Sequence, residues 1–132
     1  MKMIFCNGCF DVLHRGHIEL LKYARSLGDK LAVGIDSDNR VKYLKGSTRP
    51  FNSQDDRKAM LESIKYVDEV FIFGSEGELE LLIKDLKPST MIVGEDYKNK
   101  KVVGHTPDIE LRFFNKINGY STTDFIKNIT SR

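Results

Sequence analysis

Short apolar segments alternate with amphipathic segments along almost the entire chain, and this alternation is the feature that most restricts its fold. The apolar segments predict strands over 3–6, 30–35, 69–73, 90–93 and 109–114. The amphipathic segments predict helices over 17–27, 53–64, 78–86 and 122–129. Strands that are apolar along their whole length are buried on both faces. The pattern therefore predicts an α/β fold in which a parallel five-stranded sheet carries helices on both faces.

The length and the net charge of the chain limit the number of domains and the kinds of partner that we expect. The 132 residues predict a single domain over 1–132. The chain has 21 basic and 19 acidic residues, a formal net charge of +2. Because this balance is typical of neither a nucleic-acid surface nor a membrane surface, we expect no nucleic-acid partner and no membrane partner. The sequence has no run of about 18 apolar residues, and its apolar start is too short for a signal peptide. We therefore expect a cytoplasmic protein.

Two cysteines, Cys6 and Cys9, form a C-x-x-C pair. A zinc site would need further ligands at suitable spacing, and the chain has no second cysteine pair, so we predict no resident metal site. The motif of thioredoxin-like proteins normally opens a helix, whereas Cys6 ends an apolar run. We interpret the pair as reduced structural thiols, with a thiol redox protein as the alternative.

The loops that follow the predicted strands are where function is expected. In parallel α/β sheets, ligands bind in a crevice beyond the carboxyl ends of the strands. These loops span 7–16, 36–52, 74–77, 94–104 and 115–121, and the second of them has a predicted helical turn over 40–44. They hold most of the glycines, and all three histidines lie in them or at their edges.

Two histidines, His14 and His17, flank Gly16 at the start of the first predicted helix. His17 shares a helix face with Leu20 and Leu21, so we expect its ring to point inward. A helix N-terminus offers unpaired N–H groups and a partial positive charge, and a glycine lets a phosphate approach the backbone. The arrangement favours a site for a nucleotide phosphate chain. The alternative is a core histidine beside an unrelated turn.

Two further helix starts carry candidate binding groups. Arg57 lies on the buried face of its predicted helix, near the N-terminus, where a cation opposes the helix dipole. We therefore expect an anion beside it, either Asp11 or a bound phosphate, with a structural ion pair to a carboxylate as the alternative. Ser121, Thr122 and Thr123 open the last predicted helix and aim a second N-terminus at the crevice.

The order of these motifs resembles a known family over nearly the whole chain. Residues 8–17, Gly-Cys-Phe-Asp-Val-Leu-His-Arg-Gly-His, resemble the signature of the cytidylyltransferase-type nucleotidyltransferases, whose domains are Rossmann-like. Residues 44–50, 94–97, 102–104 and 119–123 resemble the adenylyltransferase domain of bacterial ADP-heptose synthases. Residues 64–70 are more similar to glycerol-3-phosphate cytidylyltransferase, although Lys65 stands where that enzyme usually carries arginine.

The resemblance implies a role for each matching residue. It implies that His14 and His17 contact the nucleotide phosphates and stabilise charge as pyrophosphate leaves, and that Lys45 reaches over the same phosphates, with Lys42 as a possible substitute. It places Asp96 against a ribose hydroxyl or a base amine. Asp11, Arg49 and Arg57 are predicted to bind substrate, and Asp11 has orientation of a histidine as its other predicted role. The residues predicted to bind the nucleotide are Gly8, Cys9, Phe10, Gly16, Gly94, Asp96, Tyr97, Ser121, Thr122 and Thr123.

The resemblance also implies a reaction and its partners. We expect transfer of a nucleotidyl group from a nucleoside triphosphate, carried with Mg²⁺, to a sugar or polyol phosphate, and we expect a homodimer. ATP with a heptose 1-phosphate-like sugar is the first prediction, and CTP with glycerol 3-phosphate is the alternative. A non-catalytic nucleotide-binding module is a second alternative.

The chain departs from its relatives after Gly104. Members of the heptose group usually have a helix between this glycine and the strand expected at Ile109, and Pro107 disfavours a helix here.

Overall fold

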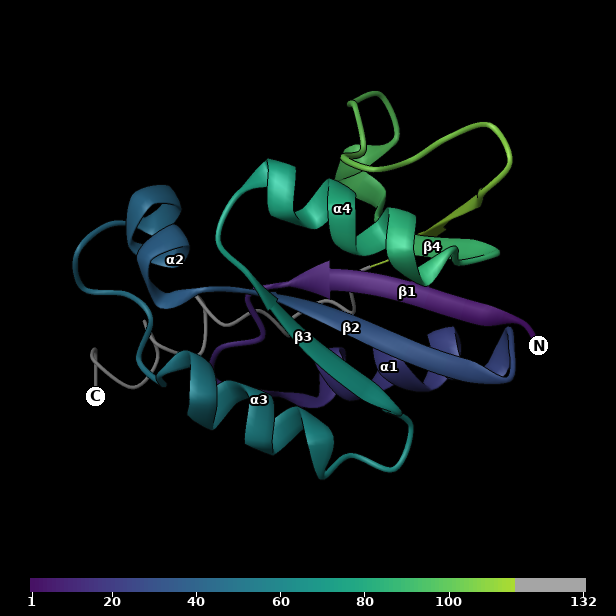
Figure 1. Ribbon diagram of the computed structural model, residues 1–132. Coiled ribbons are helices and arrows are strands. Elements are labelled where there is room, and N and C mark those ends of the chain that lie inside the picture. Colours follow the sequence, from purple (N-terminus) through teal and green to yellow (C-terminus); the bar gives the residue numbers. More distant parts are fainter. Residues whose placement is uncertain (116–132) are drawn as a thin grey trace.

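A five-stranded parallel sheet forms the centre of the computed structural model, which describes residues 1–115 (Figure 1). The strands are β1 (Met3–Gly8), β2 (Lys30–Asp36), β3 (Glu69–Phe73), β4 (Thr90–Gly94) and β5 (Glu110–Phe114). The helices are α1 (Arg15–Ser26), α2 (Asp38–Lys45), α3 (Gln54–Glu62), α4 (Glu76–Leu86) and the short 3₁₀ helix η1 (Glu95–Tyr97). The predicted α/β, Rossmann-like sheet with five parallel strands is confirmed.

The strand order is β3-β2-β1-β4-β5, so the order reverses beside β1. β1 pairs with β2 on one side, with Cys6 opposite Val33, and with β4 on the other, with Cys6 opposite Ile92. In a sheet of this kind the loops after the two central strands diverge and leave a crevice at the switch point. The loops after β1 and β4 are therefore the geometric candidates for a ligand site.

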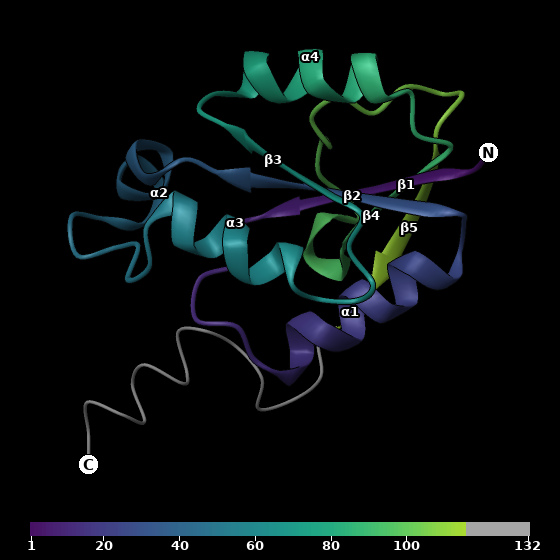
Figure 2. The same cartoon turned by 60° about the horizontal axis from the view of Figure 1, so that its bottom comes forward.

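Helices cover both faces of the sheet, as the alternation predicts. In Figures 1 and 2, α1 and α3 lie on one face and α4 on the other. Alternate residues of each strand supply the two cores. The core under α1 and α3 includes Ile4, Cys6 and Val33, and the core under α4 includes Phe5 and Ala32, all of them buried.

Helical structure extends further than predicted in the loop after β2. The predicted turn over 40–44 is a full helix, α2, because the Ser37 side chain accepts the N–H of Arg40 and caps its first turn. Short polar helices lack the apolar periodicity on which the prediction rested. Similarly, α4 begins two residues before the predicted start, where the Ser75 side chain accepts the N–H of Glu78.

Gly28 follows the last residue of α1 by two positions, where a glycine predicts a left-handed C-terminal cap. Its φ is not among the positive values in the described chain, so it forms no left-handed cap. A Cβ at this position would lie 2.7 Å from the Lys2 carbonyl oxygen and 2.8 Å from Ile4 Cγ1. The glycine is required because the chain passes close to β1.

The predicted helix over 122–129 lies outside the described residues, as do Ser121, Thr122 and Thr123. Within residues 1–115, no helix is both long and apolar enough to cross a membrane.

Candidate active site

Two histidine side chains close the N-terminus of α1, and each accepts a backbone hydrogen bond. His14 is the N-cap, and its Nδ1 accepts the N–H of Gly16 at 3.0 Å. His17 lies three residues later, and its Nδ1 accepts the N–H of His14 at 3.1 Å. The two rings lie 4.0 Å apart between centroids. This is a reciprocal capping box in which imidazoles replace the usual hydroxyl and carboxylate.

The hydrogen bonds determine the tautomer of both rings. An Nδ1 atom that accepts an N–H is unprotonated, so the neutral ring carries its proton on Nε2 and donates from there. Burial, with the neighbouring His14 and Lys45, lowers the pKa of His17 to about 4. Burial also lowers the pKa of His14. At neutral pH the helix therefore ends in two uncharged rings that carry Nε2–H donors.

The N–H of Gly16, expected from the sequence to lie open to a phosphate, is already bonded to His14. The Nε2–H groups of the two rings therefore replace this N–H as the donors at the helix terminus.

The loop between β1 and α1 is strained and firmly held. Phe10 and Val12 both have φ of 52°, a left-handed conformation that is unusual for a bulky or β-branched residue. Asp11 lies between them and is buried, and its carboxylate accepts the N–H groups of Phe51 at 2.7 Å and Asn52 at 3.0 Å. Phe10 is itself buried in the core and packs against the His17 ring. Asp11 thus joins the strained loop to the loop that precedes α3.

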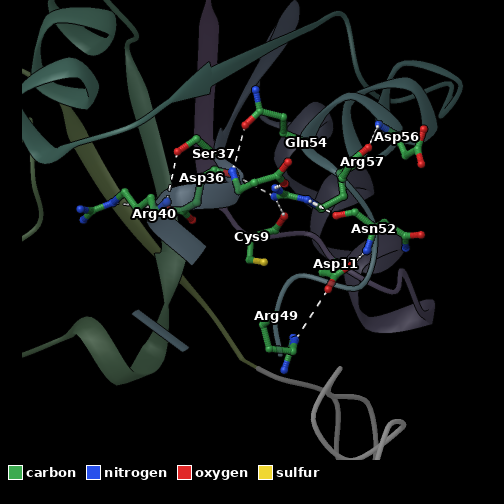
Figure 3. Close-up of polar contacts among 12 residues, drawn as sticks. Cys9, Asp11, Asp36, Ser37, Arg40, Arg49, Asn52, Gln54, Asp56 and Arg57 are labelled. Carbon is green, nitrogen blue, oxygen red and sulfur yellow. Dashed lines mark hydrogen bonds and ion pairs between the residues drawn. The ribbon is translucent and has the colours of Figure 1, made fainter. Parts of the chain in front are cut away.

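Arg57 links three segments around the crevice (Figure 3). Its side chain is buried, and Nη1 donates to the carbonyl oxygens of Cys9 and Asp36, each at 2.8 Å. Nε donates to the Asn52 carbonyl at 3.0 Å, and Nη2 pairs with Asp38 at 2.9 Å. The anion beside Arg57 is therefore Asp38 rather than the expected Asp11 or phosphate. Arg57 thus holds together the ends of β1 and β2, the start of α2 and the loop before α3. Its contact with substrate stays a prediction.

Arg49 differs from Arg57 because, within residues 1–115, part of its guanidinium lacks hydrogen-bond partners. Its Nε lies 3.7 Å from Asp11 Oδ2, and its guanidinium carbon lies 5.5 Å from the centroid of the Phe51 ring. Nε and Nη2 are buried, and neither makes a hydrogen bond within the described part of the chain. Since buried donors are normally hydrogen-bonded, these two atoms are suited to an anionic ligand.

Lys45, the last residue of α2, lies close enough to the helix tip to act on it electrostatically. Its positive charge lowers the pKa of His17, and the same charge opposes the burial that raises the pKa of the Cys9 thiol. Lys45 also lines a cleft of about 400 Å³ at the carboxyl ends of the central strands. His14 and His17 do not line this cleft themselves, so Lys45 is a residue that lines the cleft and also acts on the imidazole rings.

The cleft collects residues from both sides of the switch point. Gly8 at the end of β1, Cys9 just after it, Gly94 at the end of β4 and Tyr97 of η1 all line it. Asp96, on the same short helix, is exposed and does not line this cleft. The further lining residues are Asn7, Asp36, Arg40, Leu44, Phe73, Glu76, Leu79, Val93, Lys101, Val102 and Val103.

Sequence reasoning missed Asp36 and Arg40, which line this cleft from β2 and α2. A longer helix after β2, recognisable from Ser37 as an N-cap, would have placed Arg40 one turn above Asp36. His105 lies away from the cleft, and its Nε2 is 2.8 Å from the Ile109 carbonyl oxygen.

The thiols have little reactive character. Burial raises the pKa of Cys6 to about 12 and also raises the pKa of Cys9. Since the thiolate is the reactive form, these shifts argue against the redox alternative. The residues 1–115 contain no group of three or more His, Cys, Asp or Glu side chains arranged to hold a metal ion.

The parallel sheet and the imidazole-tipped helix at its switch point define a nucleotidyltransferase type of α/β domain. Comparison with protein families agrees, because the cytidylyltransferase-like family matches residues 5–128. The chain belongs to the cytidylyltransferase-like family, and the predicted resemblance is confirmed.

Curated relatives carry the name bifunctional protein HldE. The protein of Campylobacter concisus is 49% identical over 128 residues, which are 97% of this chain and 27% of that protein. The protein of Helicobacter pylori strain J99 is 45% identical over the same shares of both chains. The chain thus spans little more than a quarter of the length of these relatives.

Solved structures support the fold. A lipopolysaccharide core biosynthesis protein from Thermoplasma volcanium has a TM-score of 0.69 and 27% identity, covering 89% of this chain and 97% of that one. A pantoate-β-alanine ligase from Francisella tularensis has a TM-score of 0.63 and 22% identity, covering 98% of this chain and 66% of that one. The second likeness concerns the fold alone.

Proposed function

We propose that this chain transfers an adenylyl group from ATP to a heptose 1-phosphate-like sugar and releases pyrophosphate. The observation that carries the proposal is the pair of neutral imidazoles at the tip of α1, 4.0 Å apart between centroids, with Nε2–H donors. Donors fixed in place before the reaction stabilise charge that develops on phosphoryl oxygens.

The reaction requires positioning more than covalent chemistry from the protein. An oxygen of the acceptor phosphate attacks the α-phosphorus of the nucleotide. The bond from that phosphorus to the bridging oxygen breaks, and pyrophosphate leaves with the electron pair. His14 and His17 donate to the phosphoryl oxygens, and Lys45 and Arg49 supply positive charge on the side of α2 and the loop after it.

Mg²⁺ belongs to the nucleotide substrate in this proposal. It prefers oxygen ligands and is commonly held through phosphates and water, with few protein side chains. Asp11 is a poor candidate ligand, because its two oxygens already accept the N–H groups of Phe51 and Asn52.

The choice of ATP and of a sugar acceptor rests on the resemblance of several motifs to the adenylyltransferase domain of bacterial ADP-heptose synthases. The relatives named HldE, at 42–49% identity, support this choice. Transfer of cytidylyl from CTP to glycerol 3-phosphate is the second candidate, favoured by the likeness of residues 64–70 to that class of enzyme. We also propose a cytoplasmic location, which the two free thiols, Cys6 and Cys9, support. A homodimer is proposed as well, because the family resemblance implies it.

A pyrophosphate-release assay tests the proposal. Each of the four common nucleoside triphosphates is incubated with Mg²⁺ and with heptose 1-phosphate, hexose 1-phosphates or glycerol 3-phosphate. Release with ATP and heptose 1-phosphate at the highest kcat/KM is the expected result. Highest kcat/KM with CTP and glycerol 3-phosphate would favour the second candidate, and nucleotide binding without release under any pairing would favour a non-catalytic module.

A further inference from the structure

A charged pair that the proposed chemistry does not use lies in the cleft beside Cys9. Asp36 ends β2, Arg40 lies one turn into α2, and Arg40 Nε is 3.3 Å from Asp36 Oδ1. Both side chains are largely buried, with 18% of Arg40 and 13% of Asp36 exposed. Figure 3 shows Arg40 on one side of Asp36 and Arg57 on the other. Both residues thus line the cleft at the carboxyl end of β2.

The Arg40 guanidinium has a buried N–H donor that can still bind a ligand. Its Nε is buried, and within residues 1–115 the contact with Asp36 lacks the geometry of a hydrogen bond. The Asp36 carboxylate faces three cations, Arg40, Lys45 and Arg57, yet burial raises its pKa. Buried polar groups of this kind normally have partners. The pair is suited to a ligand that offers both a phosphate and hydroxyl groups.

The composition of the cleft fits the same kind of ligand. Arg40, Lys45 and Lys101 line it with positive charge, and Asp36 and Glu76 supply carboxylates. Guanidinium and ammonium groups bind phosphate, and carboxylates accept hydrogen bonds from sugar hydroxyls. The volume of about 400 Å³ lies within the usual range for small-molecule sites.

Lys45 connects this cleft to the imidazole rings. Its charge acts on His17 at the tip of α1 and on Asp36 within the cleft. A phosphorylated ligand with its phosphate at Lys45 would therefore present that phosphate to a nucleotide held by the rings, while its polyol part would extend toward Asp36.

We propose that Asp36 and Arg40 determine acceptor specificity: Arg40, with Lys45, holds the phosphate of a sugar phosphate, and Asp36 accepts from its hydroxyl groups. This inference rests on the proposed function, because it names the part of the site that selects the second substrate.

Steady-state kinetics of Arg40→Met and Asp36→Asn test the inference. We expect Arg40→Met to raise the KM for heptose 1-phosphate by about tenfold or more, while the KM for ATP changes less than about twofold. Arg40→Lys should restore part of the affinity for heptose 1-phosphate.

Asp36→Asn tests the role of the carboxylate. It should reduce the ratio of kcat/KM for heptose 1-phosphate to kcat/KM for glycerol 3-phosphate by about tenfold. Lys30→Met, which removes an ion pair with Glu69 at the opposite end of β2, is the matched control and should leave both KM values unchanged.

Parallel rises in both KM values, or an unchanged KM for heptose 1-phosphate in Arg40→Met, would overturn the inference. If the unaltered protein releases no pyrophosphate with any pair of substrates, the proposed function fails. The acceptor site is then tested by the binding of heptose 1-phosphate alone. In a titration with heptose 1-phosphate followed by NMR, the methyl signals of Val93, Val102 and Val103 should shift in the unaltered protein and not in Arg40→Met. Absence of shifts in the unaltered protein would contradict the acceptor site.

Discussion

Each histidine of the α1 tip has a structural role and a proposed chemical role, and different ring nitrogens carry them. The Nδ1 atoms of His14 and His17 satisfy backbone N–H groups, which fixes the rings and leaves Nε2 as the donor. A single alanine substitution would therefore mix loss of a helix cap with loss of catalysis. Substitutions that keep the acceptor and remove the donor separate the two.

His14→Asp and His17→Glu are such substitutions, because an ionised carboxylate accepts hydrogen bonds and donates none. Aspartate is a good N-cap, and glutamate is a natural partner at the third position of a capping box. We expect each variant to lower kcat by about 10²-fold while its melting temperature stays within about 4 °C of the unaltered protein. Ser75→Ala, which removes the cap of α4, is the control, with an expected loss of about 1 kcal/mol of stability and unchanged kcat. Near-normal kcat in both histidine variants would contradict the assigned role.

The lowered pKa of His17 also makes a prediction about stability and pH. The unfolded chain takes up a proton at this residue near pH 6.5, whereas the folded protein does so only near pH 4. As pH falls from about 6.5 to about 4, the free energy of unfolding should therefore decrease, by at most about 1.4 kcal/mol per pH unit from His17. Urea unfolding at pH 7 and pH 5 should show a smaller decrease in His17→Gln. An equal decrease in both proteins would show that His17 is not buried in neutral form.

At the scale of elements, buried charged side chains hold the loops of the site together. Arg57 of α3 bonds to the ends of β1 and β2, and Asp11 of the β1–α1 loop bonds to the loop before α3. The strained backbone at Phe10 and Val12 lies within this network. Strain of this kind persists only where surrounding contacts impose it. We infer that this network fixes the position of the α1 tip relative to α2.

Loss of Arg57 should therefore destabilise the whole domain. Arg57→Met leaves the carbonyl oxygens of Cys9, Asp36 and Asn52 without their donor and Asp38 without its cation. We expect the free energy of unfolding to fall by about 3 kcal/mol or more, as measured by urea denaturation. Lys58→Met, on the next residue of the same helix, should change it by less than about 0.5 kcal/mol. A loss below about 1 kcal/mol in Arg57→Met would contradict the positioning role.

Local sequence patterns predicted most of the helices and strands, but they did not reveal all of the contacts that stabilise them. The five strands were predictable because their apolar runs are buried on both faces. α2 was underestimated because it is short and polar and depends on the Ser37 cap. The close approach of Gly28 to Lys2, and the pairing of Arg57 with Asp38, involve residues 26 and 19 positions apart. Such contacts depend on tertiary placement, which periodicity does not encode.

At the scale of the whole molecule, the order β3-β2-β1-β4-β5 brings distant segments to one crevice. The sequence placed candidate residues in the loops after β1, β2 and β4, and Gly8, Cys9, Lys45, Gly94 and Tyr97 do line a common cleft. Sequence reasoning could not distinguish residues that face this cleft from those that support it. Asp11 and Arg57 belong to the supporting group, because their polar atoms are bonded to neighbouring loops.

We propose that the imidazole tip of α1 binds the triphosphate of a nucleotide. The decisive experiment is a crystal structure with a non-hydrolysable ATP analogue and Mg²⁺. We expect phosphoryl oxygens about 3 Å from the Nε2 atoms of His14 and His17, with Lys45 directed at the same phosphates. An analogue bound elsewhere, or one whose phosphates lie beyond hydrogen-bonding distance of both rings, would contradict it.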